Sequence, residues 1–216
     1  MINRVYQQAK QSLLLNEVVV ATDSAIIEDH CKNANMQVIM TSEHHQSGTD
    51  RVAEVAASSL ADVVINIQGD EPFIPPTFID RLCEQFSDQK TEIATLIAPI
   101  GNPDVMNNPN IVKVIRRTDG RALYFSRSVI PYHRNKNFEM NSYRHLGVYG
   151  FKRSILLELA ALEQGNLERY EMLEQLRWLE AGYDISTAIV DSAPIGVDVP
   201  EDIERIMLYM EQNGLV

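Results

Sequence analysis

The segment VVINIQGDEPFIPP, from Val63 to Pro76, joins a strand-like apolar run to a glycine, two adjacent acids and three prolines. Valine and isoleucine favour a buried strand, and the prolines suit the start of a helix expected over residues 75–86. The segment therefore predicts a strand whose end carries carboxylates. In parallel α/β sheets ligands gather at such strand ends, because several loops converge there.

Strands and helices alternate on both sides of this segment. Strands are expected over residues 17–22, 36–41, 62–69, 92–100 and 184–190, and helices over 2–15, 22–35, 49–59, 75–86, 153–162, 166–182 and 200–210. Alternation with short links predicts an α/β fold, a doubly wound, mostly parallel sheet with helices on both faces. We expect one domain over residues 1–216.

The pattern changes after Pro109. Residues 111–131 contain two β-rich stretches around an Asp-Gly turn, and residues 143–151 form a third. Such a turn between β-rich stretches is typical of a hairpin, so this section predicts antiparallel strands. We expect a β-rich insertion over about residues 110–152 that acts as a lid over the site or joins two subunits.

Composition narrows the class of function. Of the 216 residues, 45% are hydrophobic, which is enough for a buried core, and the formal net charge of −11 has the wrong sign for sequence-independent binding of nucleic acid. No apolar run is long enough to cross a bilayer. Cys31 and Cys83 lie far apart without metal-binding spacing, which suits reduced thiols. We expect a soluble, cytoplasmic protein that has no nucleic-acid partner and binds anions through a local basic cluster or a metal ion.

Asp70 directly follows the strand of the opening segment. It either opens a turn before the prolines or binds Mg²⁺, which takes one or two protein carboxylates together with substrate phosphates. Asp198 is a second candidate, because it also follows an apolar strand and a glycine. Taken alone, Asp198 and Glu201 fit a helix capping box. Taken with Asp70, Asp198 predicts a shared metal site.

The segment HHQSGTDRVAE provides a third group of candidates. Ser47, Gly48 and Thr49 precede a helix whose first N–H groups could bind an anion or a base edge. Arg51 adds a fork of hydrogen-bond donors. The two adjacent histidines could suggest zinc, but they point in different directions and no third ligand is spaced to join them, so solvated loop residues are the favoured interpretation.

Six segments together resemble one known family. These are HHQSGTDRVAE, VVINIQGDEPFIPP, YFSRSVIPY, YRHLGVYGF, YEMLEQLRWLEAG and GVDVPEDIERI. In this order and spacing they closely resemble the 3-deoxy-manno-octulosonate (Kdo) cytidylyltransferases, the CMP-Kdo synthetases of Gram-negative bacteria, over essentially the whole chain. In that family the anomeric 2-hydroxyl of Kdo attacks the α-phosphate of CTP, with Mg²⁺. The products are pyrophosphate and CMP-Kdo, which serves lipopolysaccharide synthesis.

The resemblance implies roles for particular residues. It implies that Asp70 and Asp198 bind the metal and act in catalysis. The nucleotide-binding residues that it implies are Ser47, Gly48, Thr49, Arg51 and Gln68. The sugar-binding residues that it implies are Arg127, His145, Glu174 and Gln175. Structural roles stay open for some of these, with Glu174 and Arg177 as an exposed helix pair and His145 as a hydrogen-bonded strand residue.

The resemblance also implies substrates, a cofactor and an assembly. CTP and Kdo are the expected small-molecule substrates, Mg²⁺ the expected cofactor and a homodimer the expected assembly. A Rossmann-like nucleotidyltransferase sheet is the expected architecture. Two alternatives stay open: another CMP-sugar synthetase, such as one that makes CMP-sialic acid, and a non-catalytic remnant that binds CTP or Kdo.

The start of the chain departs from the family's pattern. The family begins with a strand and a loop rich in Gly, Ser, Arg and Lys that holds the triphosphate, whereas the first glycine here is Gly48. Met1 therefore matches a point after that loop. We expect a truncated start or a shortened variant, a sheet that lacks one strand near its centre, and poor turnover by the chain as written.

Overall fold

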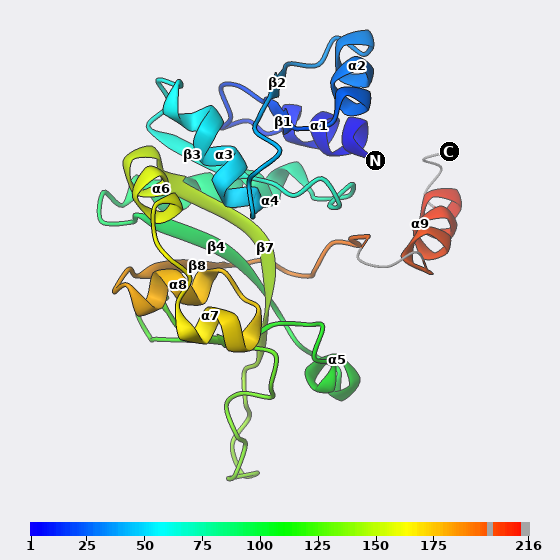
Figure 1. Ribbon diagram of the computed structural model, residues 1–216. Helices are drawn as coiled ribbons and strands as arrows, with labels where there is room; N and C mark the ends of the chain where they lie inside the picture. The colour runs from blue at the N-terminus through cyan, green and yellow to red at the C-terminus, as the bar shows by residue number, and fades with distance from the viewer. Residues whose placement is uncertain (198–200, 213–216) are drawn as a thin grey trace.

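The computed structural model describes residues 1–197 and 201–212, in which helices surround two sheets (Figure 1). The helices are α1 (Ile2–Lys10), α2 (Ala25–Asn33), α3 (Gly48–Ala57), α4 (Pro76–Cys83), the 3₁₀ helix η1 (Glu84–Ser87), α5 (Pro103–Asn107), α6 (Arg153–Ala160), α7 (Asn166–Glu171), α8 (Gln175–Glu180) and α9 (Glu201–Gln212). The strands are β1 (Val20–Thr22), β2 (Val38–Met40), β3 (Val63–Asn66), β4 (Ile93–Pro99), β5 (Lys113–Arg116), β6 (Ala122–Ser126), β7 (Tyr143–Lys152) and β8 (Ile185–Ile189). The predicted α/β class is confirmed.

The larger sheet is organised around β7. This strand pairs antiparallel with β4 along one edge, and with β5 and then β3 along the other. β4 pairs in parallel with β8, and β5 pairs antiparallel with β6. β3, β4 and β8 therefore share one direction, as expected for a parallel sheet, but β7 runs against them at the centre.

The β-rich section supplies β5, β6 and β7. Its predicted antiparallel pairing is confirmed. These three strands belong to the larger sheet, because β7 lies between β3 and β4 and binds both. The segment between β6 and β7 extends away from the sheet, at the bottom of Figure 1. A role for this section as a lid or a subunit contact stays a prediction.

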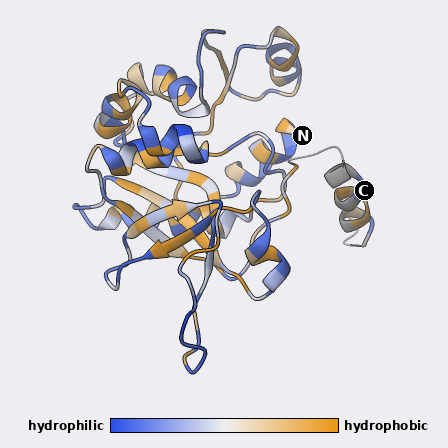
Figure 2. Ribbon diagram, turned by 60° about the horizontal axis from the view of Figure 1, so that its bottom comes forward, coloured by the Kyte–Doolittle hydropathy of each residue, from blue (hydrophilic) through white to orange (hydrophobic). Residues whose placement is uncertain are grey.

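Both faces of the larger sheet are buried, which explains the apolar sequence of β4. Ile93 and Ile97 pack in one cluster with Trp178, whereas Leu96 and Ala98 pack in a second cluster. Successive strand residues point to opposite faces, so these clusters form the two cores of the domain. The central strands are largely orange in Figure 2, and blue stretches lie on the helices around them. No helix in the described part of the chain is both long and apolar enough to cross a membrane.

The N-terminal part forms a small layer of its own. β1 pairs in parallel with β2 as a two-stranded sheet. Tyr6, Val20, Cys31 and Met36 pack together there as a third hydrophobic cluster. Contacts of β1 with α3 connect this layer to the rest of the domain.

α1 ends earlier than the helical periodicity over residues 2–15 predicts. Oδ1 of Asp80, in α4, accepts a hydrogen bond from the Ser12 hydroxyl at 2.5 Å. The same oxygen accepts from the backbone N–H groups of Leu13 at 2.9 Å and Leu14 at 3.1 Å. This carboxylate satisfies donors that a longer helix would have satisfied internally, and it fixes the end of α1 against α4.

The helix expected over residues 166–182 is two helices. Met172 follows α7 with φ 53° and ψ 50°, the left-handed conformation. This conformation costs a residue with a Cβ atom about 1–2 kcal/mol. Contacts in the site described below hold the chain in this turn.

Candidate active site

The carboxyl end of β3 meets the start of α3. Gln68 lies just beyond β3, and its side-chain amide packs against the backbone of Gly48, the first residue of α3. A Cβ atom added to Gly48 would lie 3.1 Å from Nε2 and 3.2 Å from Oε1 of Gln68. Two predicted nucleotide-binding residues are thus in contact, and the close approach explains why a glycine occupies this position.

Ser47 caps α3. Its hydroxyl accepts a hydrogen bond from the backbone N–H of Asp50 at 3.1 Å, as an N-cap residue does. The first N–H groups of a helix have no partner within it and carry the positive end of the helix dipole. The start of this ten-residue helix can therefore bind an anion or a base edge.

Thr49 links α3 to the start of α8. Its hydroxyl is buried and donates a hydrogen bond to Oε2 of Glu174 at 2.6 Å. Burial raises the pKa of Glu174, and the hydrogen bonds from Thr49 and Ser47 act in the opposite direction. The contact joins a predicted nucleotide-binding residue to a predicted sugar-binding residue.

Arg51 points toward the ends of β1 and β2. Its guanidinium donates to Oγ1 of Thr41 at 2.6 Å and to Oδ2 of Asp23 at 2.7 Å. The hydrogen bond from Arg51 lowers the pKa of Asp23. Arg51 therefore fixes the two strand ends to α3, beside the other candidate nucleotide-binding residues.

Arg127 is held by backbone carbonyl oxygens. Its guanidinium donates to the carbonyls of Glu171 at 2.8 Å, Pro109 at 3.1 Å and Met172 at 3.4 Å. The Glu171 carboxylate instead accepts from the Ser126 hydroxyl and the Arg127 backbone N–H. These carbonyl contacts orient the guanidinium. No carboxylate among the described residues pairs with it, so it can bind an external anion.

His145 lies on β7 within an aromatic group. Its ring centroid is 5.1 Å from that of Phe125 and 5.2 Å from that of Tyr149. Nε2 of His145 is 3.0 Å from Oγ1 of Thr95. Burial, with a smaller contribution from Arg144, lowers the pKa of His145 to about 3, so the ring is neutral at physiological pH.

Asp70 lies in the turn after β3 and is exposed. Its backbone carbonyl accepts a hydrogen bond from the N–H of Val197 at 3.0 Å. A Cβ atom added to Gly196 would lie 3.6 Å from the same carbonyl oxygen. The segment that leads to Asp198 therefore runs beside Asp70, but Asp198 lies outside the described residues.

The family of the chain follows from comparison with known proteins. Residues 1–185 match the model of a family described as cytidylyltransferase. The 3-deoxy-manno-octulosonate cytidylyltransferase of Parabacteroides distasonis is 43% identical over 97% of this chain and 87% of its own length. That of Chloroherpeton thalassium is 43% identical over 99% of this chain and 88% of its own length. The chain belongs to the cytidylyltransferase family.

Solved structures agree with this cytidylyltransferase assignment. A structure of CMP:2-keto-3-deoxy-manno-octonic acid synthetase complexed with CTP matches with a TM-score of 0.94 at 38% identity, over 98% of this chain and 88% of the other. A putative glucose-1-phosphate thymidylyltransferase from Bacillus anthracis shares the fold alone, with a TM-score of 0.65 at 13% identity over 96% of this chain and 81% of the other. The family resemblance of the six segments is confirmed.

Two further side chains near the candidate site end in polar atoms without a partner among the described residues. The Tyr149 hydroxyl and Nε2 of Gln175 are buried and have no hydrogen-bond partner among the described residues. Burial, with a smaller contribution from Glu174, raises the pKa of Tyr149. Buried polar atoms normally have partners, so these two suit a ligand. Tyr149 was not among the residues predicted from the sequence, although its spacing of four from His145 places both on one face of a strand.

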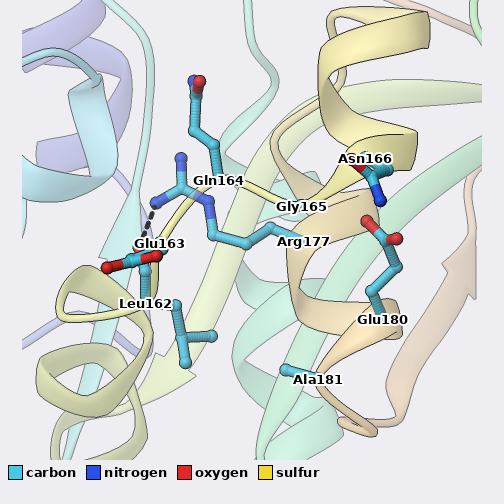
Figure 3. Close-up of a pocket in the computed structure, with 8 residues that line it drawn as sticks. All are labelled: Leu162, Glu163, Gln164, Gly165, Asn166, Arg177, Glu180 and Ala181. Carbon is cyan, nitrogen blue, oxygen red and sulfur yellow. Dashed lines mark hydrogen bonds between the residues drawn. The ribbon is translucent and has the colours of Figure 1, made fainter.

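A cavity of about 310 Å³ lies away from these residues, between α8 and the link from α6 to α7 (Figure 3). Arg177 lines it, but its guanidinium pairs with the Glu168 carboxylate at 2.7 Å and donates to the Leu162 carbonyl at 3.1 Å. Glu180 accepts from the backbone N–H of Leu167. The charged groups of Arg177 and Glu180 therefore already have partners within the protein. The alternative of an exposed Glu174–Arg177 pair is wrong, because Arg177 is buried against Glu168.

Proposed function

We propose that this cytidylyltransferase transfers a cytidylyl group from CTP to the 2-hydroxyl of 3-deoxy-D-manno-octulosonate, releasing pyrophosphate. The observation that carries the proposal is the 2.6 Å hydrogen bond between Thr49 and Glu174. It brings the start of α3, suited to a nucleotide, against a group of buried polar side chains suited to a sugar. A transfer enzyme needs both substrates in one site, because orientation of the reacting groups supplies much of its rate enhancement.

The nucleotide half of the proposed site is the start of α3 with the end of β3. Ser47, Gly48 and Thr49 offer hydroxyls and backbone N–H groups, and Gln68 offers an amide that can pair with a base or a ribose. Arg51 supports this half by fixing two strand ends to α3. A fixed polar edge of this kind favours cytosine over a larger purine.

The sugar half is lined by groups that match an acidic polyhydroxy compound. The Arg127 guanidinium bonds to backbone carbonyls, forms no ion pair with a described carboxylate, and suits the carboxylate of the sugar. Glu174, Gln175 and His145 suit its hydroxyl groups, since each can accept or donate a hydrogen bond. Tyr149 adds a buried phenolic hydroxyl to this half.

Asp70 and Asp198 are the proposed ligands of Mg²⁺. The exposed carboxylate of Asp70 supplies the hard oxygen atoms that this cation prefers, and the hydrogen bond from Val197 brings the segment before Asp198 to the same turn. When bound, Mg²⁺ neutralises charge on phosphate oxygens. The protein then has to hold the 2-hydroxyl in line with the α-phosphate and the pyrophosphate leaving group, because phosphoryl transfer requires mainly positioning and charge stabilisation.

Pyrophosphate release measures the proposed activity. The assay supplies CTP and Mg²⁺ with either Kdo or sialic acid, on this chain and on a version extended by the family's N-terminal strand and loop. We expect release that depends on Kdo and not on sialic acid. Release that depends on sialic acid would favour the other CMP-sugar synthetase. Binding of CTP or Kdo without release from either version would favour the non-catalytic remnant.

We also propose a homodimer, formed in part by the segment between β6 and β7. Tyr132 and Phe138 on this segment are 86% and 71% exposed. Large exposed aromatic side chains on a projecting segment are typical of protein interfaces. Sedimentation equilibrium should give twice the mass of the chain, and Tyr132→Ser together with Phe138→Ser should weaken the association. A monomer at all concentrations would contradict the proposal.

A further inference from the structure

Thr95 lies where the pairing of β4 with β7 is irregular. Thr95 is opposite Tyr149 and the next residue, Leu96, is opposite Leu146, so two residues of β7 bulge between them. Thr95 is fully buried. A bulge re-aims the backbone groups beside it, and here the carbonyls of Leu146 and Val148 both point toward the Thr95 hydroxyl.

The Thr95 hydroxyl has three neighbours but only one proton. Its Oγ1 lies 2.8 Å from the carbonyl oxygen of Val148 and 3.2 Å from that of Leu146, and both of these atoms can only accept. Its third neighbour is Nε2 of His145 at 3.0 Å. A hydroxyl donates one hydrogen bond and accepts up to two, so the proton must be assigned within this set.

We infer that Thr95 fixes the tautomer of His145, with the proton on Nε2 and a lone pair on Nδ1. The Thr95 hydroxyl donates to a carbonyl of β7, and the ring nitrogen that faces it must then donate to Oγ1. In the opposite tautomer the hydroxyl would donate to His145, and both carbonyl oxygens would face an oxygen atom with no hydrogen between them. In a buried site an unmade hydrogen bond of this kind is strongly disfavoured.

The assigned tautomer determines what His145 offers to a ligand. Nδ1 makes no hydrogen bond with any described residue, so in this tautomer it is an acceptor for a hydroxyl proton. The ring is neutral, because burial keeps the pKa of His145 low. This step rests on the proposed function, in which His145 faces the sugar. Thr95 is then a positioning residue for the sugar, although it does not itself touch the ligand.

Nitrogen NMR of the histidine rings tests the assignment without any substrate. The chain has five histidines, and the spectrum of His145→Gln identifies the signals of His145 by their loss. We expect a protonated Nε2 and an unprotonated Nδ1 in the free protein. A protonated Nδ1 with an unprotonated Nε2 would overturn the inference.

Two variants then separate a positioning role from a packing role. Thr95→Val keeps the shape but removes the hydroxyl, and should shift the tautomer toward a protonated Nδ1. Thr95→Ser keeps the hydroxyl and should retain the tautomer. We expect Thr95→Val to weaken Kdo binding about tenfold, equivalent to about 1.4 kcal/mol, with CTP binding unchanged. Thr95→Ser should bind Kdo as the unchanged protein does.

The outcomes distinguish this inference from the proposed function. An unchanged tautomer or unchanged Kdo binding in a folded Thr95→Val protein would overturn the positioning role. If Thr95→Val does not fold, the tautomers of the unchanged protein and of Thr95→Ser still decide the assignment. A protein that has the expected tautomer but binds no Kdo would contradict the proposed function and leave the assignment standing.

Discussion

The hydrogen bond between Thr49 and Glu174 should make a large, pH-dependent contribution to stability. The test is Thr49→Val, which keeps the shape of the side chain and removes its hydroxyl. Thr49 is 3% exposed and its hydroxyl lies 2.6 Å from the Glu174 carboxylate. A hydrogen bond to a charged group contributes about 1.5–3 kcal/mol, so we expect the free energy of unfolding at neutral pH to fall by that amount. For a chain of this length, the melting temperature should fall by roughly 3–12 °C.

The sign of the pH dependence follows from the pKa of Glu174. Burial raises the folded-state pKa above its usual value, so this group favours folding at low pH, and its contribution is lost as the pH rises through that pKa. The Thr49 hydroxyl offsets part of this loss, because it binds the charged carboxylate. Removal of the Thr49 hydroxyl therefore raises the pKa of Glu174 further. The cost of Thr49→Val should therefore be small at acidic pH and should grow as the pH rises.

Urea unfolding of the variants at a series of pH values measures this cost. Thr91→Val is the matched control, since Thr91 is 7% exposed and its hydroxyl makes no hydrogen bond with any described residue. We expect Thr91→Val to change the free energy of unfolding little at any pH. An equal cost for Thr49→Val and Thr91→Val, or a cost of Thr49→Val that does not vary with pH, would refute the reasoning.

Three further changes test the proposed site and the fold. Asp70→Asn should abolish Mg²⁺-dependent pyrophosphate release in whichever version of the protein is active, and should leave the melting temperature unchanged. The reason is that the amide keeps the shape of the side chain and removes its charge. Normal turnover would contradict a role of Asp70 as a metal ligand. Gly48→Ala should raise the KM for CTP several-fold, because its Cβ atom would meet the Gln68 amide at 3.1 Å, whereas Gly101→Ala, with no atom within 4 Å, is the silent control. Asp80→Ala should lower the free energy of unfolding in urea by about 1–3 kcal/mol, because it leaves the donors after α1 without their acceptor; no change would show that water replaces it.

Local patterns predicted most of the elements and the antiparallel pairing of the β-rich section, but not how β7 joins the larger sheet. The run from Val63 to Asn66 was predictable as a strand, because β-branched residues favour one, and its loop was predictable from the glycine and prolines that follow. The position of β7 between β3 and β4 was not predictable. Its register depends on contacts between segments far apart in the chain, such as Phe151 with both Val64 and Ile93.

In the candidate site, too, the sequence predicted individual residues but not the contacts between residues far apart in the chain. The candidate residues lie in separate sequence motifs, and the match to the cytidylyltransferase family confirms the resemblance that grouped these motifs. The sequence alone could not show that Thr49 touches Glu174, because 125 positions separate them. Nor could it show that Arg177 pairs with Glu168, nine positions away, because helical spacing makes neighbours of residues three or four positions apart and so favours Glu174. The roles of these residues toward substrates stay predictions until the variants are measured.

The break between α7 and α8 is the clearest conflict between local preference and the observed structure, and it has a physical reason. In a continuous helix the carbonyls of Glu171 and Met172 would accept from the N–H groups four residues later. The left-handed turn at Met172 frees both carbonyls, and Arg127 binds them at 2.8 and 3.4 Å. The same turn starts α8 beside Glu174. Conflicts of this kind concentrate at functional sites, because function selects a geometry that local propensity disfavours. Here one strained residue orients Arg127, whose guanidinium pairs with no carboxylate among the described residues, and sets the direction of the helix that begins at Glu174 and Gln175.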